Sequence, residues 1–184
     1  MGTWCDRYKA PDVEIQLKHL KSSIRTSAAH LRDSSGSFSS CRFHHLAHCL
    51  LFLDDEEAAC VAFERQITKC ADGIIKHNVF CNLCGPSTMI TGERHVCRSC
   101  PNVDLCHSCK KKYDRGASVP GCVRHKFLRI PRDNWRELAA DTLDESGLSI
   151  DQWLGHLQCK IGDKPKPTAT SCLLYTSPSP RDCS

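Results

Sequence analysis

The sequence predicts an α-helical N-terminal region followed by a small, cysteine-rich, metal-binding module. Two observations support this prediction. In residues 1–70, apolar side chains recur at steps of three and four, which is the spacing of one helix face. In residues 77–131, four residue pairs share one spacing, with two residues between the members of each pair. These pairs are Cys81/Cys84, Cys97/Cys100, Cys106/Cys109 and Cys122/His125.

The N-terminal region, residues 1–70, is expected to contain three helices. The apolar face of the first is formed by Val13, Leu17, Leu20, Ile24, Ala28 and Leu31. The small polar segment 33–40 interrupts this pattern, and a second helix is expected from about residue 42 to residue 53. Asp54 and Asp55 are then predicted to form a turn and an N-cap. Acidic residues after this cap favour the start of a third helix, which is expected to run to about Thr68.

The second and third helices also carry the spacing of small and large residues found in one known helical repeat. The matching residues are Leu46, Ala47, Leu50, Leu53, Asp55, Ala59 and Phe63. This stretch resembles a tetratricopeptide repeat, which implies a hairpin of two packed helices. A single repeat cannot bury its apolar face alone, and at least about three are needed for stability. The resemblance therefore implies that the chain is the end of a larger helical-repeat protein.

The helical region also contains isolated cysteines and histidines. Cys41, Cys49, Cys60 and Cys70 form no chelating turn, and they are expected to be free thiols buried among apolar residues. His44 and His48 lie one helical turn apart, but no third ligand is near them in sequence. No metal site is therefore predicted in this region.

The four pairs of the cysteine-rich module indicate zinc. Zinc prefers four soft or borderline ligands at tetrahedral corners, and a C-x2-C turn supplies two of them from one loop. Four such turns make two complete sites, so two structural Zn²⁺ ions are expected. Four protein ligands leave no open position on either ion, which argues against zinc catalysis and against an enzyme. The gaps of 12, 5 and 12 residues between the pairs permit either sequential or crossed pairing.

Further motifs surround the pairs: His77, Gly92-x-Arg94, Asp104-Leu105-Cys106 and His125-x-Phe127-x-x-Ile130. With these motifs, segment 77–131 resembles the ZZ-type zinc finger. The resemblance implies a small two-zinc cross-brace α+β module with short β-strands, in which the first and third pairs share one zinc and the second and fourth share the other. The two implied ligand sets are Cys81, Cys84, Cys106 and Cys109, and Cys97, Cys100, Cys122 and His125.

The module departs from the family at one ligand. The family usually ends in two histidines, and Cys122 stands where the first of them is expected. Three thiolates with one imidazole still make an ordinary structural zinc set. His95 and His107 are possible substitutes, but each lies so close to a cysteine pair in sequence that its imidazole is not expected to reach the position of the missing ligand. Arg94 is expected to pack along the sheet, and the small apolar core is expected to contain Phe80, Val96, Leu105, Phe127 and Ile130.

The resemblance to ZZ fingers also implies a function, the binding of a polypeptide partner, often by its free N-terminus. In such binders an acidic cluster receives the α-amino group, and the matching positions here are Asn82, Asn102 and Asp104. Amides supply no charge, and charge-assisted hydrogen bonds are about twice as strong as neutral ones. Weak or absent recognition of the amine is therefore expected. Asp104 has an alternative role in orienting the zinc site through backbone N–H groups.

Two other functions are compatible with paired zinc sites. A RING-like ubiquitin-ligase component also holds two zincs in crossed pairs, but it would normally show a C-x-H-x2-C centre, which is absent here. A nucleic-acid-binding finger would need more positive charge and more stacking aromatics. The module has nine Lys and Arg against three acidic residues, and two Zn²⁺ with seven thiolates reduce this excess to about +3. The sequence therefore favours a polypeptide partner.

The C-terminal part is expected to be only partly folded. Residues 132–160 are predicted to form one or two short helices, one around Trp135 and Leu138 and one from Ile150 to Leu157 capped by Ser149. Residues 161–184 are predicted to be a disordered tail, in which 172–182 resembles a translated sequencing adapter.

The composition points to a reducing compartment. The chain has 15 cysteines, an odd number, and about half of them lie in metal-type pairs rather than in a disulfide framework. No secretory signal is visible at the start, and no stretch approaches the roughly 18 apolar residues of a membrane span. A cytoplasmic or nuclear location without membrane contact is therefore expected.

Overall fold

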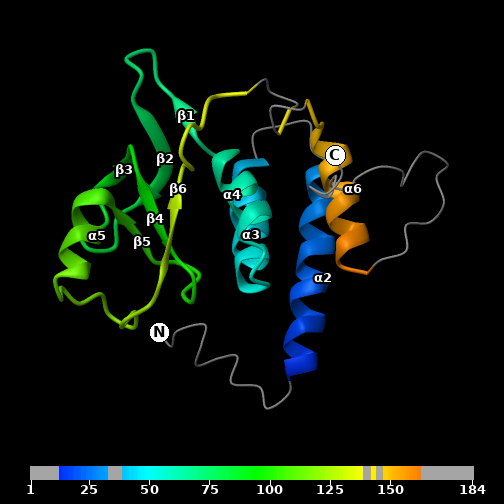
Figure 1. Ribbon diagram of the computed structural model, residues 1–184, viewed down its shortest axis with the longest axis horizontal. Coiled ribbons are helices and arrows are strands. Elements are labelled where there is room, and N and C mark those ends of the chain that lie inside the picture. Colours follow the sequence, from blue (N-terminus) through cyan, green and yellow to red (C-terminus); the bar gives the residue numbers. More distant parts are fainter. Residues whose placement is uncertain (1–12, 33–38, 139–141, 144–146, 163–184) are drawn as a thin grey trace, which may run out of the picture.

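The computed structural model describes residues 13–32, 39–138, 142–143 and 147–162. Its elements run in the order α2 (Val13–Arg32), α3 (Ser39–Phe52), α4 (Glu56–Glu64), β1 (Thr68–Lys69), β2 (Ile75–Phe80), β3 (Met89–Thr91), β4 (Arg94–Cys97), β5 (Asp104–Cys106), α5 (His107–Asp114), β6 (Phe127–Ile130) and α6 (Ile150–Lys160). The predicted helical N-terminal region and the small module of antiparallel strands are both present (Figure 1). The predicted adapter-like segment 172–182 lies outside the described residues.

The strands form two small antiparallel sheets. One has the order β1-β2-β3, and the other has the order β5-β4-β6. In the second sheet, Arg94 lies opposite Cys106 on β5 and Ile130 on β6. This sheet lies between α5 and the helical layer of α3 and α4, beyond which α2 and α6 pack (Figure 1).

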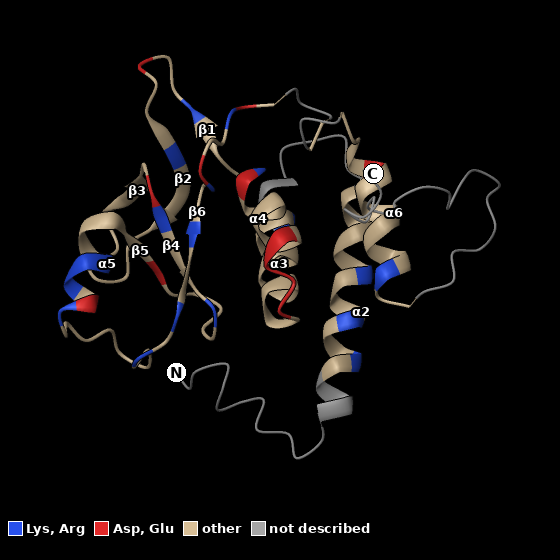
Figure 2. Ribbon diagram, in the orientation of Figure 1, with Lys and Arg blue, Asp and Glu red and all other residues tan. Residues whose placement is uncertain are grey.

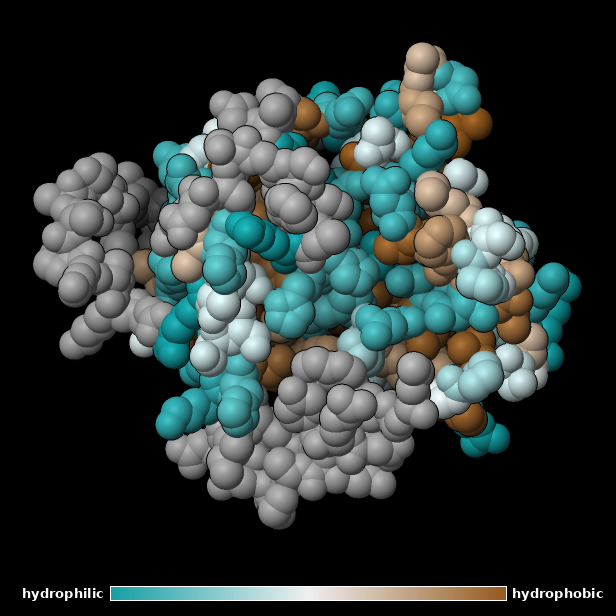
Figure 3. All heavy atoms as spheres, turned by 180° about the vertical axis from the view of Figure 1, so that it is seen from behind, coloured by the Kyte–Doolittle hydropathy of each residue, from teal (hydrophilic) through white to brown (hydrophobic). Residues whose placement is uncertain are grey.

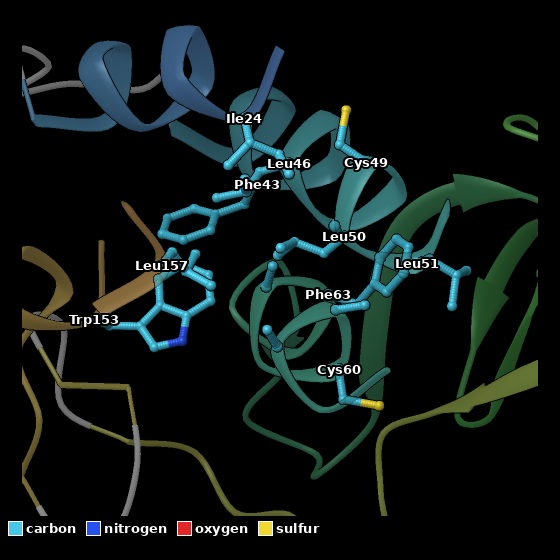
Figure 4. Packing of buried hydrophobic residues seen from close by; sticks show 14 of the residues in the cluster. Ile24, Phe43, Leu46, Cys49, Leu50, Leu51, Cys60, Phe63, Trp153 and Leu157 are labelled. Carbon is cyan, nitrogen blue, oxygen red and sulfur yellow. The ribbon is translucent and has the colours of Figure 1, made fainter. Parts of the chain in front are cut away.

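The main hydrophobic core joins the helices to the sheet. It contains Ile24 of α2, Phe43 and Leu50 of α3, Phe63 of α4 and Trp153 of α6. Figure 4 shows these side chains converging between the helices. The same core includes Val96, Leu128 and Ile130 from β4 and β6. Each fully buried side chain of this size contributes roughly 1.5–3 kcal/mol. The cysteine-rich module therefore shares its core with the helical region.

Ion pairs reinforce this junction. The Arg132 guanidinium donates to both carboxylate oxygens of Glu64 on α4, with an Nη2–Oε2 distance of 2.7 Å. The Nη2 atom of Arg98 donates to Oε2 of Glu56 at 2.6 Å. Both pairs link the cysteine-rich half of the chain to α4.

Two predicted helix caps are present. The Asp55 side chain accepts a hydrogen bond from the N–H of Ala58 at the start of α4. Ser149 and Gln152 form a reciprocal capping box at the start of α6. Each pair satisfies backbone donors that the first turn of a helix leaves unpaired.

The third predicted helix is shorter than expected. It ends at Glu64 rather than near Thr68, and Thr68–Lys69 forms strand β1. The backbone N–H groups of Gln66 and Ile67 bond to carbonyls three residues earlier, which tightens and closes the last turn. Thr68 then pairs with Lys76 of β2.

Two further expectations differ from the structure. Residues 131–138 contain no helix, and Asn134 has a φ of 63°, which is incompatible with a right-handed helix. Phe80 is 50% exposed rather than part of the core. The register of β2 against β3 shifts between Lys76 and Phe80, and Asn78 has a φ of 53°. A bulge of this kind displaces the alternation of side chains between the two faces.

The predicted tetratricopeptide hairpin corresponds to α3 and α4, which pack against each other. Leu46, Ala47, Ala59 and Phe63 are fully buried between them and their neighbours. However, α4 has only 9 residues, and a strand follows it instead of another helical hairpin. The assignment of these helices to a repeat family stays a prediction.

The described surface has a mixed character. On the face shown in Figure 3, hydrophobic residues are interspersed among hydrophilic ones. None of the described helices combines the length and the apolar character that a membrane span requires.

Candidate metal centres

The first cluster contains Cys81, Cys84, Cys106 and Cys109, whose sulfur atoms all lie within 4.8 Å of one another. The first two cysteines follow β2, and the other two lie at the junction of β5 and α5. Cys84 Sγ lies 3.2 Å from Cys109 Sγ and 3.8 Å from Cys106 Sγ. The backbone N–H of Cys106 donates to Cys81 Sγ at 3.4 Å, which links the start of α5 to the loop after β2.

The second cluster contains Cys97, Cys100, Cys122 and His125, again within 4.8 Å. The Nδ1 atom of His125 lies 3.5 Å from Cys97 Sγ and 3.3 Å from Cys100 Sγ. Cys97 Sγ lies 3.5 Å from Cys122 Sγ. The hydroxyl of Tyr113 accepts a hydrogen bond from the backbone N–H of His125 at 2.9 Å, which holds the last ligand loop against α5.

These distances fit zinc. Tetrahedral zinc with Zn–S bonds of about 2.3 Å separates two sulfurs by about 3.8 Å, and separates sulfur from an imidazole nitrogen by about 3.5 Å. The observed separations of 3.2–3.8 Å lie near these values, and all eight cysteines and histidines of the clusters converge without a disulfide. The two clusters are therefore consistent with two structural zinc ions, one on four thiolates and one on three thiolates with an imidazole.

The pKa values of the thiols explain why a cation is needed. Burial and the neighbouring Cys97 raise the pKa of the Cys122 thiol to about 11. Burial also raises the pKa of Cys100 and of Cys109, and neighbouring thiols raise both further. Cys106 is the exception: burial raises its pKa, but hydrogen bonds with Ser108 and Cys109 lower it to about 6. Bound Zn²⁺ would supply the positive charge that lets several adjacent thiolates coexist, and its binding free energy would become folding free energy.

The grouping of ligands is the crossed one. Spacing alone left sequential and crossed pairing open, and the structure places the first pair with the third and the second with the fourth. Cys122 occupies a ligand position in the second cluster. His95 and His107 belong to neither cluster.

The three residues predicted to receive a partner's N-terminus do lie together. The Asn82 side chain accepts from the backbone N–H of Asp104 and donates to the backbone oxygen of Asn102 at 3.1 Å. Asp104 itself is only 5% exposed, and its Oδ1 atom accepts from Nε of Arg94 at 2.8 Å. Asn82 and Asn102 are exposed, whereas the single carboxylate of the group is already paired.

Arg94 is the residue whose importance the sequence did not reveal. It packs along the sheet as expected, but it is completely buried beneath the helices. Its guanidinium lies 4.9 Å from the centre of the Phe63 ring on α4, and its Nη2 atom lies 3.5 Å from Nδ1 of His44 on α3. Burial and the positive charge of Arg94 lower the pKa of His44, which keeps that imidazole neutral beside the guanidinium. The only signal in the sequence was the Gly92-x-Arg94 motif.

Comparison with known families agrees with this geometry. The family described as "Zinc finger, ZZ type" matches residues 75–117, which contain the first three ligand pairs. The last pair, Cys122 and His125, lies beyond the matched segment, and the structure adds it to the second cluster. Comparisons with curated proteins and with solved structures give no match. Segment 75–117 is therefore similar to a ZZ-type zinc finger, with both zinc-ligand clusters assembled around it.

Proposed function

We propose that this chain is a non-catalytic interaction protein whose zinc-stabilised module binds a polypeptide partner. The observation that supports this most directly is the pair of closed clusters, each with four protein ligands, of which the first three ligand pairs lie in a segment similar to a ZZ finger. A zinc ion with four protein ligands has no position for water or substrate. ZZ fingers generally serve as protein-interaction modules, so a structural role for both zincs fits a binding function.

The exposed apolar side chains of the module suggest where the partner binds. Phe80 on β2 and Met89 on β3 are cross-strand partners, and they are 50% and 42% exposed. Aromatic residues and methionine are enriched at protein interfaces. Exposed Asn82 follows Phe80 by two residues and can offer polar contacts beside this pair. We assign the binding surface to these three residues together with Asn102.

Recognition of a free N-terminus is expected to contribute little to this binding. An α-amino group needs an accessible carboxylate, and the Asp104 carboxylate is buried and neutralised by Arg94. The remaining groups are the neutral amides of Asn82 and Asn102. Acetylation of a partner's N-terminus should therefore change its affinity only slightly.

The charge distribution favours this function over nucleic-acid binding. Several basic side chains of the module are paired with carboxylates: Lys110 with Asp114, Arg129 with Asp133 and Arg94 with Asp104. Figure 2 shows acidic residues beside basic ones on α5 and along the strands. Basic side chains that are buried or already paired in this way release few counterions from nucleic acid.

Peptide-array binding tests the proposal. The zinc-loaded full chain would be applied to arrayed peptides of varied sequence, each present with a free and with an acetylated N-terminus. We expect a subset of peptides to bind in both forms, and Phe80→Ser with Met89→Ser to weaken that binding at least about tenfold, the loss expected for two interface anchors of about 1 kcal/mol or more each.

The control is a pair of substitutions at two other exposed apolar residues, Ile74→Ser with Val123→Ser, which should leave peptide binding unchanged. Binding that survives the Phe80 and Met89 substitutions would refute the assigned surface. Absence of bound peptides, combined with tight binding of single-stranded nucleic acid, would refute the proposed function itself.

A further inference from the structure

A third group of metal-binding side chains lies outside the two clusters. It consists of Glu93, His95 and His107, and one ligand atom from each lies within 4.8 Å of the others. The Nδ1 atom of His107 lies 2.7 Å from Oε2 of Glu93, and Nε2 of His95 lies 3.6 Å from the same oxygen. Two imidazole nitrogens and one carboxylate oxygen therefore lie close enough together to share one ion.

Rigid elements bring these side chains together. Glu93 immediately precedes β4, after a turn in which Gly92 has a φ of 71°. His95 lies on β4 with its side chain on the face opposite to buried Arg94, because successive residues of a strand alternate. His107 is the first residue of α5 and follows zinc ligand Cys106 directly. The two structural zinc clusters therefore hold the backbone of this group in place.

Not every polar atom of this group has a hydrogen-bond partner. The Nε2 atom of His95 is buried and has no hydrogen-bond partner among the described residues. The other oxygen of Glu93, Oε1, lies 3.6 Å from Nη1 of Arg129. A buried nitrogen without a partner, 3.6 Å from a carboxylate, needs an explanation.

The nearby positive charges do not exclude a cation. Arg129 also pairs with Asp133, and Lys110 donates to both oxygens of Asp114 at 2.6 and 2.7 Å. Each of these cations has a carboxylate of its own, so the Glu93 charge is not fully neutralised. The side chains of Glu93 and His107 are 37% and 51% exposed, which gives an ion access from solvent.

We propose that Glu93, His95 and His107 bind a third Zn²⁺ ion, with three protein ligands and an open coordination position facing solvent. Imidazole and carboxylate ligands suit zinc, and a three-ligand set is the kind that leaves a position for an external ligand. This site contains no thiolate and is partly exposed, so it binds zinc more weakly than the two cysteine clusters do. The proposal is independent of the polypeptide-binding function.

Calorimetric titration tests this site. The full chain already holding two tightly bound zinc ions would be titrated with further Zn²⁺, and we expect one additional equivalent to bind. Glu93→Gln and His107→Ala should each weaken that third equivalent by at least about tenfold, since loss of a second-shell partner alone reduces metal affinity 10–100-fold. Glu57→Gln and His156→Ala, at exposed positions of α4 and α6, are the matched controls.

Substitutions at the site itself are needed because His19, His30 and His45 line a separate cavity of about 370 Å³ and could also bind added zinc. Absence of a third equivalent, or equal weakening by the His156 and His107 substitutions, would overturn the proposal. Should either test variant lose tightly bound zinc, the imidazole NMR signals of the unsubstituted chain decide. Shifts of His95 and His107 with the third equivalent support the site, and shifts confined to other histidines refute it.

Discussion

The two faces of the β5-β4-β6 sheet are stabilised by different means. On one face, Val96, Leu128 and Ile130 join the helical core. On the other face, Leu105, Cys97 and Phe127 pack into a smaller cluster around the zinc ligands. The first face resembles the interior of any α+β domain, whereas the second has too little apolar area to fold without metal. The cysteine-rich module therefore needs both the packing of the helices against one face of the sheet and the zinc ions on the other.

The contacts between the two predicted segments, helices at 1–70 and a zinc module at 77–131, are extensive. Arg94 of β4 is buried under Phe63 of α4, and Arg132 pairs with Glu64. A polar or charged group buried across such a junction is tolerated only with its partners present. The helical layer is therefore part of the support of the module.

Removal of zinc should have the largest effect. Zinc-finger sites contribute apparent binding free energies of about 10–16 kcal/mol, so a strong chelator or Cys106→Ser should unfold the zinc-side face. Metal analysis should give two tightly bound zinc ions before the change and one or none after it. Cys60→Ser is the matched control, because Cys60 is a buried free thiol in α4, and its loss should cost about 1–3 kcal/mol without loss of zinc. Equal loss of zinc in both variants would contradict the ligand assignment.

The next largest effect is expected at the junction of the two faces. Arg94→Met would leave the Asp104 carboxylate buried without its partner, which typically costs 3–5 kcal/mol. The free energy of unfolding, measured by denaturant titration of the zinc-loaded chain, should fall by about this amount. The double variant with Asp104→Asn should recover at least half of the loss. A double variant no more stable than the single one would show that the pair contributes through packing alone.

A smaller, pH-dependent effect is expected on the helical side. Burial, with the nearby His44 and Arg94, lowers the pKa of His48 to about 2 from an ordinary 6.5. As the pH falls below 6.5, the unfolded chain takes up a proton at His48, whereas the folded chain does not. The free energy of unfolding therefore falls as the pH falls. Between pH 7.5 and 5.5 this group should account for about 1 kcal/mol of the loss.

Substitution of His48 isolates this contribution. His48→Leu should remove about 1 kcal/mol of the pH dependence, because leucine has no proton to gain and fills the site beside Phe63. The free energy of unfolding would be measured at both pH values for each chain. His156→Leu on the exposed side of α6 is the matched control. An unchanged pH slope in His48→Leu would show that His48 is not the source of the acid sensitivity.

The zinc-side features were largely predictable, and the junction was not. C-x2-C turns are local in sequence, so their spacing identifies ligands before any fold is known. Asp55 and Ser149 were predictable as caps for the same reason. The contact between Arg94 and His44 joins residues 50 positions apart, and nothing in the spacing of either residue indicates it. The group of Glu93, His95 and His107 likewise depends on the turn and strand order that bring β4 beside α5.

The smallest effect is expected at the predicted amine-binding residues, and the structure shows which of them should be substituted to test it. Asn82 uses both ends of its amide, one on the N–H of Asp104 and one on the oxygen of Asn102. Asn82→Asp would place a carboxylate against that backbone oxygen, so it should destabilise the loop. Asn102→Asp instead adds charge at an exposed side chain whose backbone alone is used here. The second change is therefore the cleaner test of amine recognition.

Asn102→Asp should raise affinity for peptides with a free N-terminus by about fivefold, because a charged hydrogen bond contributes about 1 kcal/mol more than a neutral one. Calorimetry with one bound peptide, in free and acetylated forms, measures the difference. The acetylated form should show no gain, and Asp114→Asn, which changes charge on α5, should not alter the ratio. An equal gain in affinity for both forms would mean that the new carboxylate interacts with parts of the peptide other than its N-terminal amine. No gain for either would place the peptide's N-terminus out of reach of Asn102.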